Sequence, residues 1–239
     1  MPSNMNVLTR RTIQYRTDSG ATMDVVLTVF EPFQESSDFW RCGFQFEPPR
    51  NQRIIKAGGY DAIAALLACL TVARGYIEHP SEERTTWQGM SHSGLPWHST
   101  MPDGYSLPDI PPLEANSENS SILAMRRLGT PDESDGVREL MLTVYRPFQV
   151  DEKTWKCAFA LKTTPSDSVR YGVGADFIEA LLDALAMART TYLGMIPPLW
   201  EAPESEGFGD VHFLPYRIGR AYSIDRTRLD TAPEIPTEG

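Results

Sequence analysis

LTVFEPFQ at residues 27–34 returns as LTVYRPFQ at residues 142–149, 115 positions further along the chain. The same offset aligns residues 27–74 with 142–189 without a gap, and 18 of these 48 positions are identical. Unrelated segments of this length share only a few identities, so a common origin explains the match. A repeat at a fixed offset has to be recognised before any element is assigned. The sequence therefore predicts two homologous modules in tandem.

Each copy carries four stretches with the composition of β-strands, rich in Val, Leu, Thr and aromatic residues. In the third stretch, WRCGFQF at 40–46, apolar and polar residues alternate, which predicts one buried and one wet face. Pro32 in the second stretch is expected to end the strand or place it at an edge, because proline cannot donate to a ladder. The expected strands are 6–17, 22–34, 40–46 and 52–58 in the first copy, and 121–131, 137–149, 155–161 and 167–173 in the second.

A helix is expected after the fourth strand of each copy. Asp61 and Asp176 stand where an N-cap belongs, and Glu179 would complete a capping box in the second copy. Apolar residues then recur every three or four positions in IAALLACLTVAR at 63–74 and IEALLDALAMAR at 178–189. The predicted fold class is α+β, with two modules that each pack one long helix on one face of an antiparallel sheet of about four strands.

The segments after the two helices also show similarities, although their lengths differ. LPW at 95–97 is matched with PLW at 198–200, and the Leu-Pro pair at 107–108 with that at 214–215. Residues 1–110 are then expected to form the first module with its C-terminal loop, and 111–120 a polar connector. Residues 121–216 would form the second module, and 217–239, which lack an apolar period, a poorly ordered tail.

Composition narrows the class of protein. The 239 residues carry a net charge of −10 with a pI of about 4.9, which argues against nucleic acid and is compatible with a basic protein partner. No apolar run approaches the length of a membrane span, and the N-terminal segment lacks the apolar core of a secretory signal. Cys42, Cys69 and Cys157 are sparse and odd in number, as in proteins of a reducing compartment. A cytoplasmic protein without membrane attachment is expected.

Motifs for catalysis, metals or cofactors are not found in the sequence. His79, His92, His98 and His212 show no zinc-ligand spacing. His92 and His98 share a loop with serines at 91, 93 and 99, which could suggest a nucleophile and a base. A solvated polar loop is the preferred interpretation, since no orienting acid accompanies them. Cys42 and Cys157 are expected to pack as core thiols. The prediction is no catalytic residue, no metal and no cofactor.

Aromatic residues in the proline-rich loops are the candidates for partner binding, together with the acidic residues beside them. Such aromatics serve as anchors, and an acidic rim suits a basic partner. The alternative is that these aromatics, above all Trp97 and Trp200, pin the loops onto their own modules. The candidate residues are Trp87, Trp97, Tyr105 and Trp200, with Glu82, Glu83, Glu201, Glu204 and Glu206.

The repeated G-x-D cap followed by Ala-Leu-Leu resembles uncharacterised bacterial ββββα domains found among immunity proteins, which are encoded beside secreted antibacterial toxins. The residues that carry this resemblance are Gly59, Asp61 and Ala65-Leu66-Leu67 in one copy and Gly174, Asp176 and Ala180-Leu181-Leu182 in the other. It implies a cytosolic inhibitor, monomeric when free, that occludes the active site of a cognate toxin such as a nuclease or nucleic-acid deaminase. Two alternatives stay open. One is a hydrolase or transferase at the module junction that uses His92, His98 or His212. The other is a housekeeping scaffold or adaptor.

Overall fold

The computed structural model describes residues 5–17, 19–48, 51–78, 85–99, 121–132, 136–162, 169–196, 214–218 and 221–225. The chain divides into two compact units, and the boundary between them falls between Trp97 and His98. This boundary precedes the one expected at residue 110. Each unit contains one sheet-and-helix module, as the repeat predicts.

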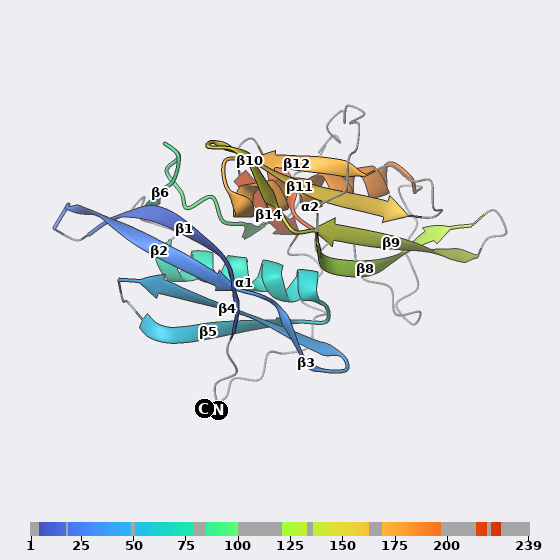
Figure 1. The fold of residues 1–239 in the computed structure, drawn as a ribbon, viewed down its shortest axis with the longest axis horizontal. Coiled ribbons are helices and arrows are strands. Elements are labelled where there is room, and N and C mark those ends of the chain that lie inside the picture. Colours follow the sequence, from blue (N-terminus) through green and yellow to red (C-terminus); the bar gives the residue numbers. More distant parts are fainter. Residues whose placement is uncertain are drawn as a thin grey trace. The chain divides into compact units, whose positions relative to one another are not determined.

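The first module is an antiparallel sheet with one helix on one face (Figure 1). Its elements are β1 Val7–Arg16, β2 Thr22–Phe30, β3 Phe33–Ser36, β4 Phe39–Glu47, β5 Asn51–Gly59, α1 Ala62–Ile77 and β6 Thr85–Thr86. The predicted second strand is interrupted at Glu31-Pro32, and β2 and β3 pair with successive parts of β4. Pro32 therefore ends a strand, as expected from its missing N–H group. β6 adds a short pairing to β1 that the sequence did not predict.

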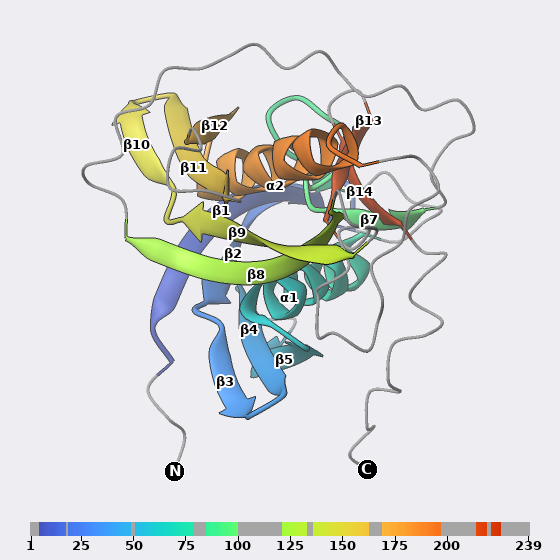
Figure 2. The same ribbon diagram turned by 90° about the vertical axis from the view of Figure 1, so that its right-hand side faces the viewer.

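The second module repeats this arrangement, and Figure 2 shows α2 lying along its sheet. Its elements are β8 Ile122–Pro131, β9 Val137–Tyr145, β10 Phe148–Asp151, β11 Thr154–Lys162, β12 Arg170–Gly174 and α2 Phe177–Leu193. A further small sheet has the order β13 (Tyr216–Ile218), β14 (Ala221–Asp225), β7 (Trp97–Ser99). The expectation of a poorly ordered tail after residue 216 is wrong for β14, in which Tyr222 is buried.

The predicted helix caps are confirmed. An Asp61 carboxylate oxygen accepts from the Ala64 N–H at 2.6 Å, and Asp176 accepts from the Glu179 N–H at 2.8 Å. Glu179 in turn accepts from the N–H of Ala175 at 2.7 Å. The reciprocal bond of the capping box thus reaches the residue before the N-cap rather than the cap itself.

Helix packing explains why both copies have a glycine two residues before the N-cap, at Gly59 and Gly174. A Cβ at Gly59 would collide with the backbone of α1 at Ala65, and a Cβ at Gly174 would collide with the backbone of α2 at Ala180. Neither glycine has a positive φ angle. Close approach of strand and helix, rather than an unusual turn conformation, therefore requires glycine here.

The matched cysteines lie in the core, as predicted. Cys42 and Cys157 are both 0% exposed. Each thiol donates to the equivalent carbonyl of the neighbouring strand, Phe30 at 3.3 Å in one module and Tyr145 at 3.4 Å in the other. The conserved thiol thus packs as a small hydrophobe with one weak hydrogen bond.

Candidate functional site

Most of the candidate binding residues from the sequence lie outside the described part of the chain. These are Tyr105, Trp200, Glu82, Glu83, Glu201, Glu204 and Glu206. The structure describes the other two, Trp87 and Trp97, which follow α1 in the first module. Trp87 is 8% exposed and Trp97 is 43% exposed. The two tryptophans therefore differ in what they can offer to a partner.

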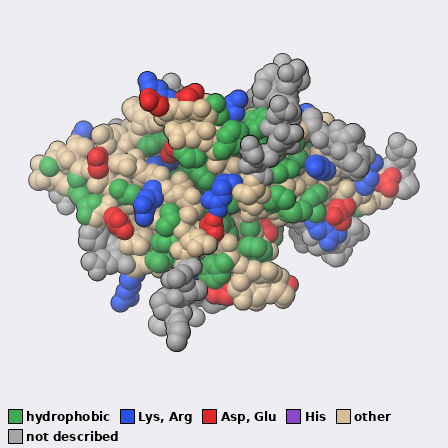
Figure 3. Space-filling view, viewed as in Figure 1, with side chains coloured by type: hydrophobic (Ala, Val, Ile, Leu, Met, Phe, Trp, Pro, Cys, Tyr) green, Lys and Arg blue, Asp and Glu red, His purple; other side chains and the backbone are tan. Residues whose placement is uncertain are grey.

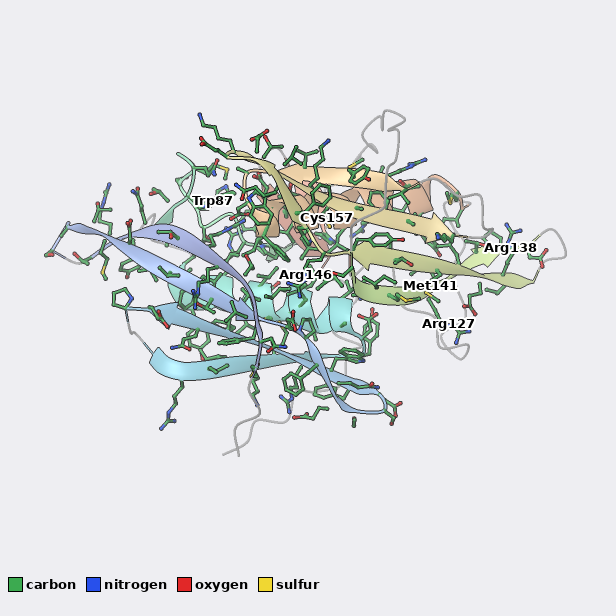
Figure 4. All side chains as sticks on the ribbon, in the orientation of Figure 1. Trp87, Arg127, Arg138, Met141, Arg146 and Cys157 are labelled. Carbon is green, nitrogen blue, oxygen red and sulfur yellow. The ribbon has the colours of Figure 1, made fainter. Side chains whose placement is uncertain are left out.

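Trp87 fills the interior of its loop instead of facing solvent. Figure 4 labels Trp87. The guanidinium carbon of Arg11, which comes from β1, lies 3.9 Å from the Trp87 ring centroid. On the same ring, Gly94 approaches so closely that a Cβ there would collide with it. The interpretation of Trp87 as an exposed anchor fails in this structure, and the alternative applies: the ring pins its loop to its own module.

Two arginines hold the rest of this loop by its carbonyl groups. Arg11 donates to the Ser93 carbonyl at 3.1 Å, and Arg74 of α1 donates to the Leu95 carbonyl at 2.7 Å. Arg74 also forms an ion pair with Glu78 at 2.6 Å, and Glu78 accepts from the Ser93 N–H. We call this set of contacts around residues 87–95 the first latch.

The second module contains an equivalent arginine contact. Arg189, the repeat counterpart of Arg74, donates to the Leu214 carbonyl at 2.7 Å. Leu95 therefore corresponds to Leu214, and the proposed equivalence of Leu214 with Leu107 is wrong. The offset grows from 115 to 119 residues after the helix, and the counterpart of Trp97 becomes Tyr216 rather than Trp200. We call the contact of Arg189 with the Leu214 carbonyl the second latch.

The sequence contained a signal for these arginines. Arg11 and Arg126 are matched on the first strands, and Arg74 and Arg189 on the helices. Three of the four are 1–2% exposed, although arginine is seldom fully buried without partners. An arginine matched between the two copies on a strand or helix therefore marks a buried polar contact, which was not predicted from the sequence.

The loop that contains His92 is packed rather than solvated, contrary to expectation. Residues 93–96 are buried, and the Ser93 hydroxyl, 0% exposed, accepts from the Leu95 N–H at 3.4 Å. His92 Nδ1 accepts from the Gly94 N–H at 3.0 Å. Desolvation, followed by the nearby Arg74 cation, lowers the pKa of His92. The hydroxyl of Ser93 and the imidazole nitrogen of His92 are thus both engaged by the loop backbone. His79, His212 and the His98 side chain lie outside the described part.

The described residues also include possible metal ligands and buried cysteine thiols. No set of three or more His, Cys, Asp or Glu side chains in this part of the chain is placed to hold a metal ion. Burial raises the pKa of both the Cys69 and the Cys157 thiols, which disfavours the reactive thiolate. In the described residues no helix combines the length and apolar character needed to cross a membrane.

A family model described as "Domain of unknown function (DUF6968)" matches residues 9–97 and 124–195, about two thirds of the chain. The two matched segments start 115 residues apart, which is the offset of the repeat. No curated protein and no solved structure matches the chain.

Proposed function

We propose on physical grounds that this member of the DUF6968 family, a domain of unknown function, is a protein-binding inhibitor built of two tandem modules. It acts as a cytosolic immunity protein that occludes the active site of a cognate antibacterial toxin. The inhibitor is monomeric when free and uses neither a metal nor a cofactor. Inhibition is steric and electrostatic, without a covalent step.

One observation supports binding over catalysis. Two matched pairs of polar groups serve the backbone in both modules: Asp61 and Asp176 cap helices, while Arg74 and Arg189 hold carbonyl groups. A duplicated enzyme would be expected to keep a matched set of reacting groups aimed at a cleft. Duplication that preserves a scaffold and lets its surface vary is more typical of binding proteins.

Charge suggests the class of partner. A net charge of −10 attracts a basic surface and speeds association with it at low salt. Toxins that act on nucleic acids present such a surface around the substrate cleft, because phosphate binding requires Lys and Arg. A nuclease or a nucleic-acid deaminase is therefore the proposed target, and the resemblance to immunity-protein domains points the same way.

Co-expression with the toxin encoded by the neighbouring gene tests this function. We expect a stable complex on size exclusion, loss of toxin activity on addition of the inhibitor, and association that slows as salt rises. Failure to form a complex at micromolar concentrations would contradict the proposal. Turnover of a substrate that disappears in His92→Ala, with the folded state retained, would favour the enzyme alternative instead.

A further inference from the structure

The two modules differ most informatively on the sheet face opposite the helix, where three strands meet. Cross-strand pairing aligns Phe33, Arg41 and Gly58 in the first module, and Phe148, Lys156 and Val173 at the equivalent positions in the second. These residues alternate with Cys42 and Cys157, which are buried beneath the helices, so they lie on the opposite face. We call each such set, with its immediate neighbours, the outer corner of its module.

The outer corner of the first module is filled by its own side chains. Arg41 forms an ion pair with Glu35 at 2.8 Å and stacks on Phe39, 5.0 Å from guanidinium carbon to ring centroid. The Phe39 ring covers Gly58 so closely that a Cβ there would collide with it. The cation thus has a carboxylate and an aromatic ring, and the glycine has the ring above it.

In the second module, the positions equivalent to Glu35 and Phe39 carry neither a carboxylate nor an aromatic ring. Val150 stands in place of Glu35, Thr154 in place of Phe39, and Val173 in place of Gly58. Val150 is 50% exposed and Val173 is 46% exposed, and both are among the large hydrophobic side chains that face solvent. Phe148 beside them is 39% exposed. Figure 3 shows hydrophobic side chains at the surface of this second sheet.

Lys156 lies at the centre of these apolar side chains. Its ammonium group is 5.8 Å from the centroid of the Tyr171 ring. None of the described residues supplies a carboxylate within ion-pair distance of it, unlike Glu35 for Arg41. Within the described part of the chain, this cation therefore has exposed apolar neighbours and no counterpart of the carboxylate that Glu35 provides to Arg41.

We propose that the outer corner of the second module binds a segment of the partner protein in which an aromatic or aliphatic side chain stands next to an Asp or Glu. This inference rests on the proposal that the chain binds a protein. The apolar side chain covers Val150, Val173 and Phe148, while the carboxylate pairs with Lys156. The first module serves as the template, because Phe39 and Glu35 occupy the corresponding places there. Burial of apolar area with one central charge pair is typical of binding hot spots.

This local acidic contact is compatible with a partner that is basic overall. The net charge of the chain acts at long range and steers the encounter, whereas Lys156 pairs with a single carboxylate at contact distance. The proposal therefore concerns one segment of the partner surface. The rest of that surface is expected to be basic, because the chain as a whole is acidic.

Two blocked tripeptides probe the corner directly: acetyl-Glu-Phe-Glu-amide and acetyl-Lys-Phe-Lys-amide, titrated into the full chain and followed by amide NMR shifts. We expect the acidic peptide to shift the amides of Lys156 and Val173, and to leave those of Arg41 and Gly58 unchanged. The basic peptide should shift none of them. Equal effects of both peptides, or no shift at the second corner, would overturn the proposal.

Val150→Glu supplies the missing carboxylate and should weaken binding of the acidic peptide about tenfold, which corresponds to about 1.4 kcal/mol. Met195→Glu is the matched control, because Met195 is 51% exposed and lies beyond the C-terminal end of α2. It should bind the peptide like the wild type. Equal weakening in both variants would indicate a general charge effect and would overturn the site.

The same two variants separate this inference from the proposed function. A toxin complex that forms equally well with wild type and Val150→Glu overturns the corner as the binding surface and leaves the inhibitor function standing. A chain that binds the acidic peptide at the corner but forms no toxin complex supports the surface and contradicts the function. Sedimentation that shows wild-type dimers and Val150→Glu monomers would identify a second copy as the occupant and overturn the proposed one.

Discussion

The two latches achieve the same contact with different surroundings. In the first, Arg74 shares its guanidinium between the Leu95 carbonyl and Glu78, and its side chain remains 13% exposed. In the second, Leu193 stands where Glu78 stands, and Arg189 is 1% exposed. The arginine-to-carbonyl bond is therefore the part of the latch that the structure describes in both modules, whereas Glu78 belongs to the first. In each module, an arginine of the helix thus holds a later segment of the chain through a backbone carbonyl of that segment.

Replacing Trp87 should have the largest effect on stability, because the Trp87 ring fills the interior of the first latch. We expect Trp87→Ala to lower the free energy of unfolding of the first module by about 3–5 kcal/mol, the cost typical of truncating a buried aromatic residue. Urea denaturation followed by far-ultraviolet circular dichroism measures this loss. Trp97→Ala is the control, and because Trp97 is 43% exposed its loss should be clearly smaller. Equal losses in the two variants would show that Trp87 has no special role in the latch.

The second latch is tested by Arg189→Met, which keeps much of the side-chain volume and removes the donor. The expected loss is about 1.5–3 kcal/mol, the usual value for a hydrogen bond to a charged group. Hydrogen exchange should accelerate in β13 and β14, since Leu214 directly precedes this pair of strands. Arg127→Met is the control, because its ion pair with Glu139 is about half exposed and such pairs contribute at most about 1 kcal/mol. Figure 4 labels Arg127 in the second module, on β8, where it pairs with Met141 of β9. Unchanged exchange in β13 and β14 would contradict the second latch.

The repeated sheet and helix could be predicted from the sequence because each depends on local patterns. Alternation in WRCGFQF at 40–46, the caps at Asp61 and Asp176, and the interruption at Pro32 all act within a few residues. Their physical causes are the pleat, free N–H groups at a helix start and the missing proline donor. The identity offset then transferred each assignment from one copy to the other.

The segments after the helices could not be aligned from the sequence for a physical reason. Leu-Pro occurs at 95–96, 107–108 and 214–215, so the pair alone does not identify its equivalent. The equivalence is defined by an arginine side chain that donates to a backbone carbonyl. Every residue has such a carbonyl, so the sequence does not indicate which one accepts the bond. The following aromatic residue, Trp97 or Tyr216, was the available clue. The burial of Trp87 escaped for a similar reason, since it depends on Arg11, 76 positions earlier in the chain.

The seam between helix and sheet differs between the modules at two matched positions, and both carry the smaller residue in the second module. Ala57 faces the helix in the first module, where Cys69 is buried, while the second module has Gly172 and Ala184 at these positions. A Cβ at Gly172 would collide with the backbone of α2 at Ala184, so the helix leaves no room there. The first module accommodates the Ala57 Cβ at the same place. In the second module the smaller residues thus go with a helix backbone that leaves no free space at Gly172, as expected for a close-packed protein interior.

The smallest expected effect is on the pH dependence of stability, and it concerns the first latch, which contains His92. Desolvation and then the Arg74 cation lower the pKa of His92 in the folded state below its ordinary value of 6.5, Glu78 opposes them, and Arg11 adds to the lowering. Below about pH 6.5 the unfolded chain then binds more protons than the folded chain, so stability falls as the pH falls until the lower folded pKa is reached. A protonated Nδ1 also loses its ability to accept from the Gly94 N–H. His92→Gln keeps an acceptor without a titrating group, and we expect its urea midpoint to fall less than that of the wild type between pH 7 and pH 5. Identical pH profiles would show that His92 does not couple the first latch to protonation.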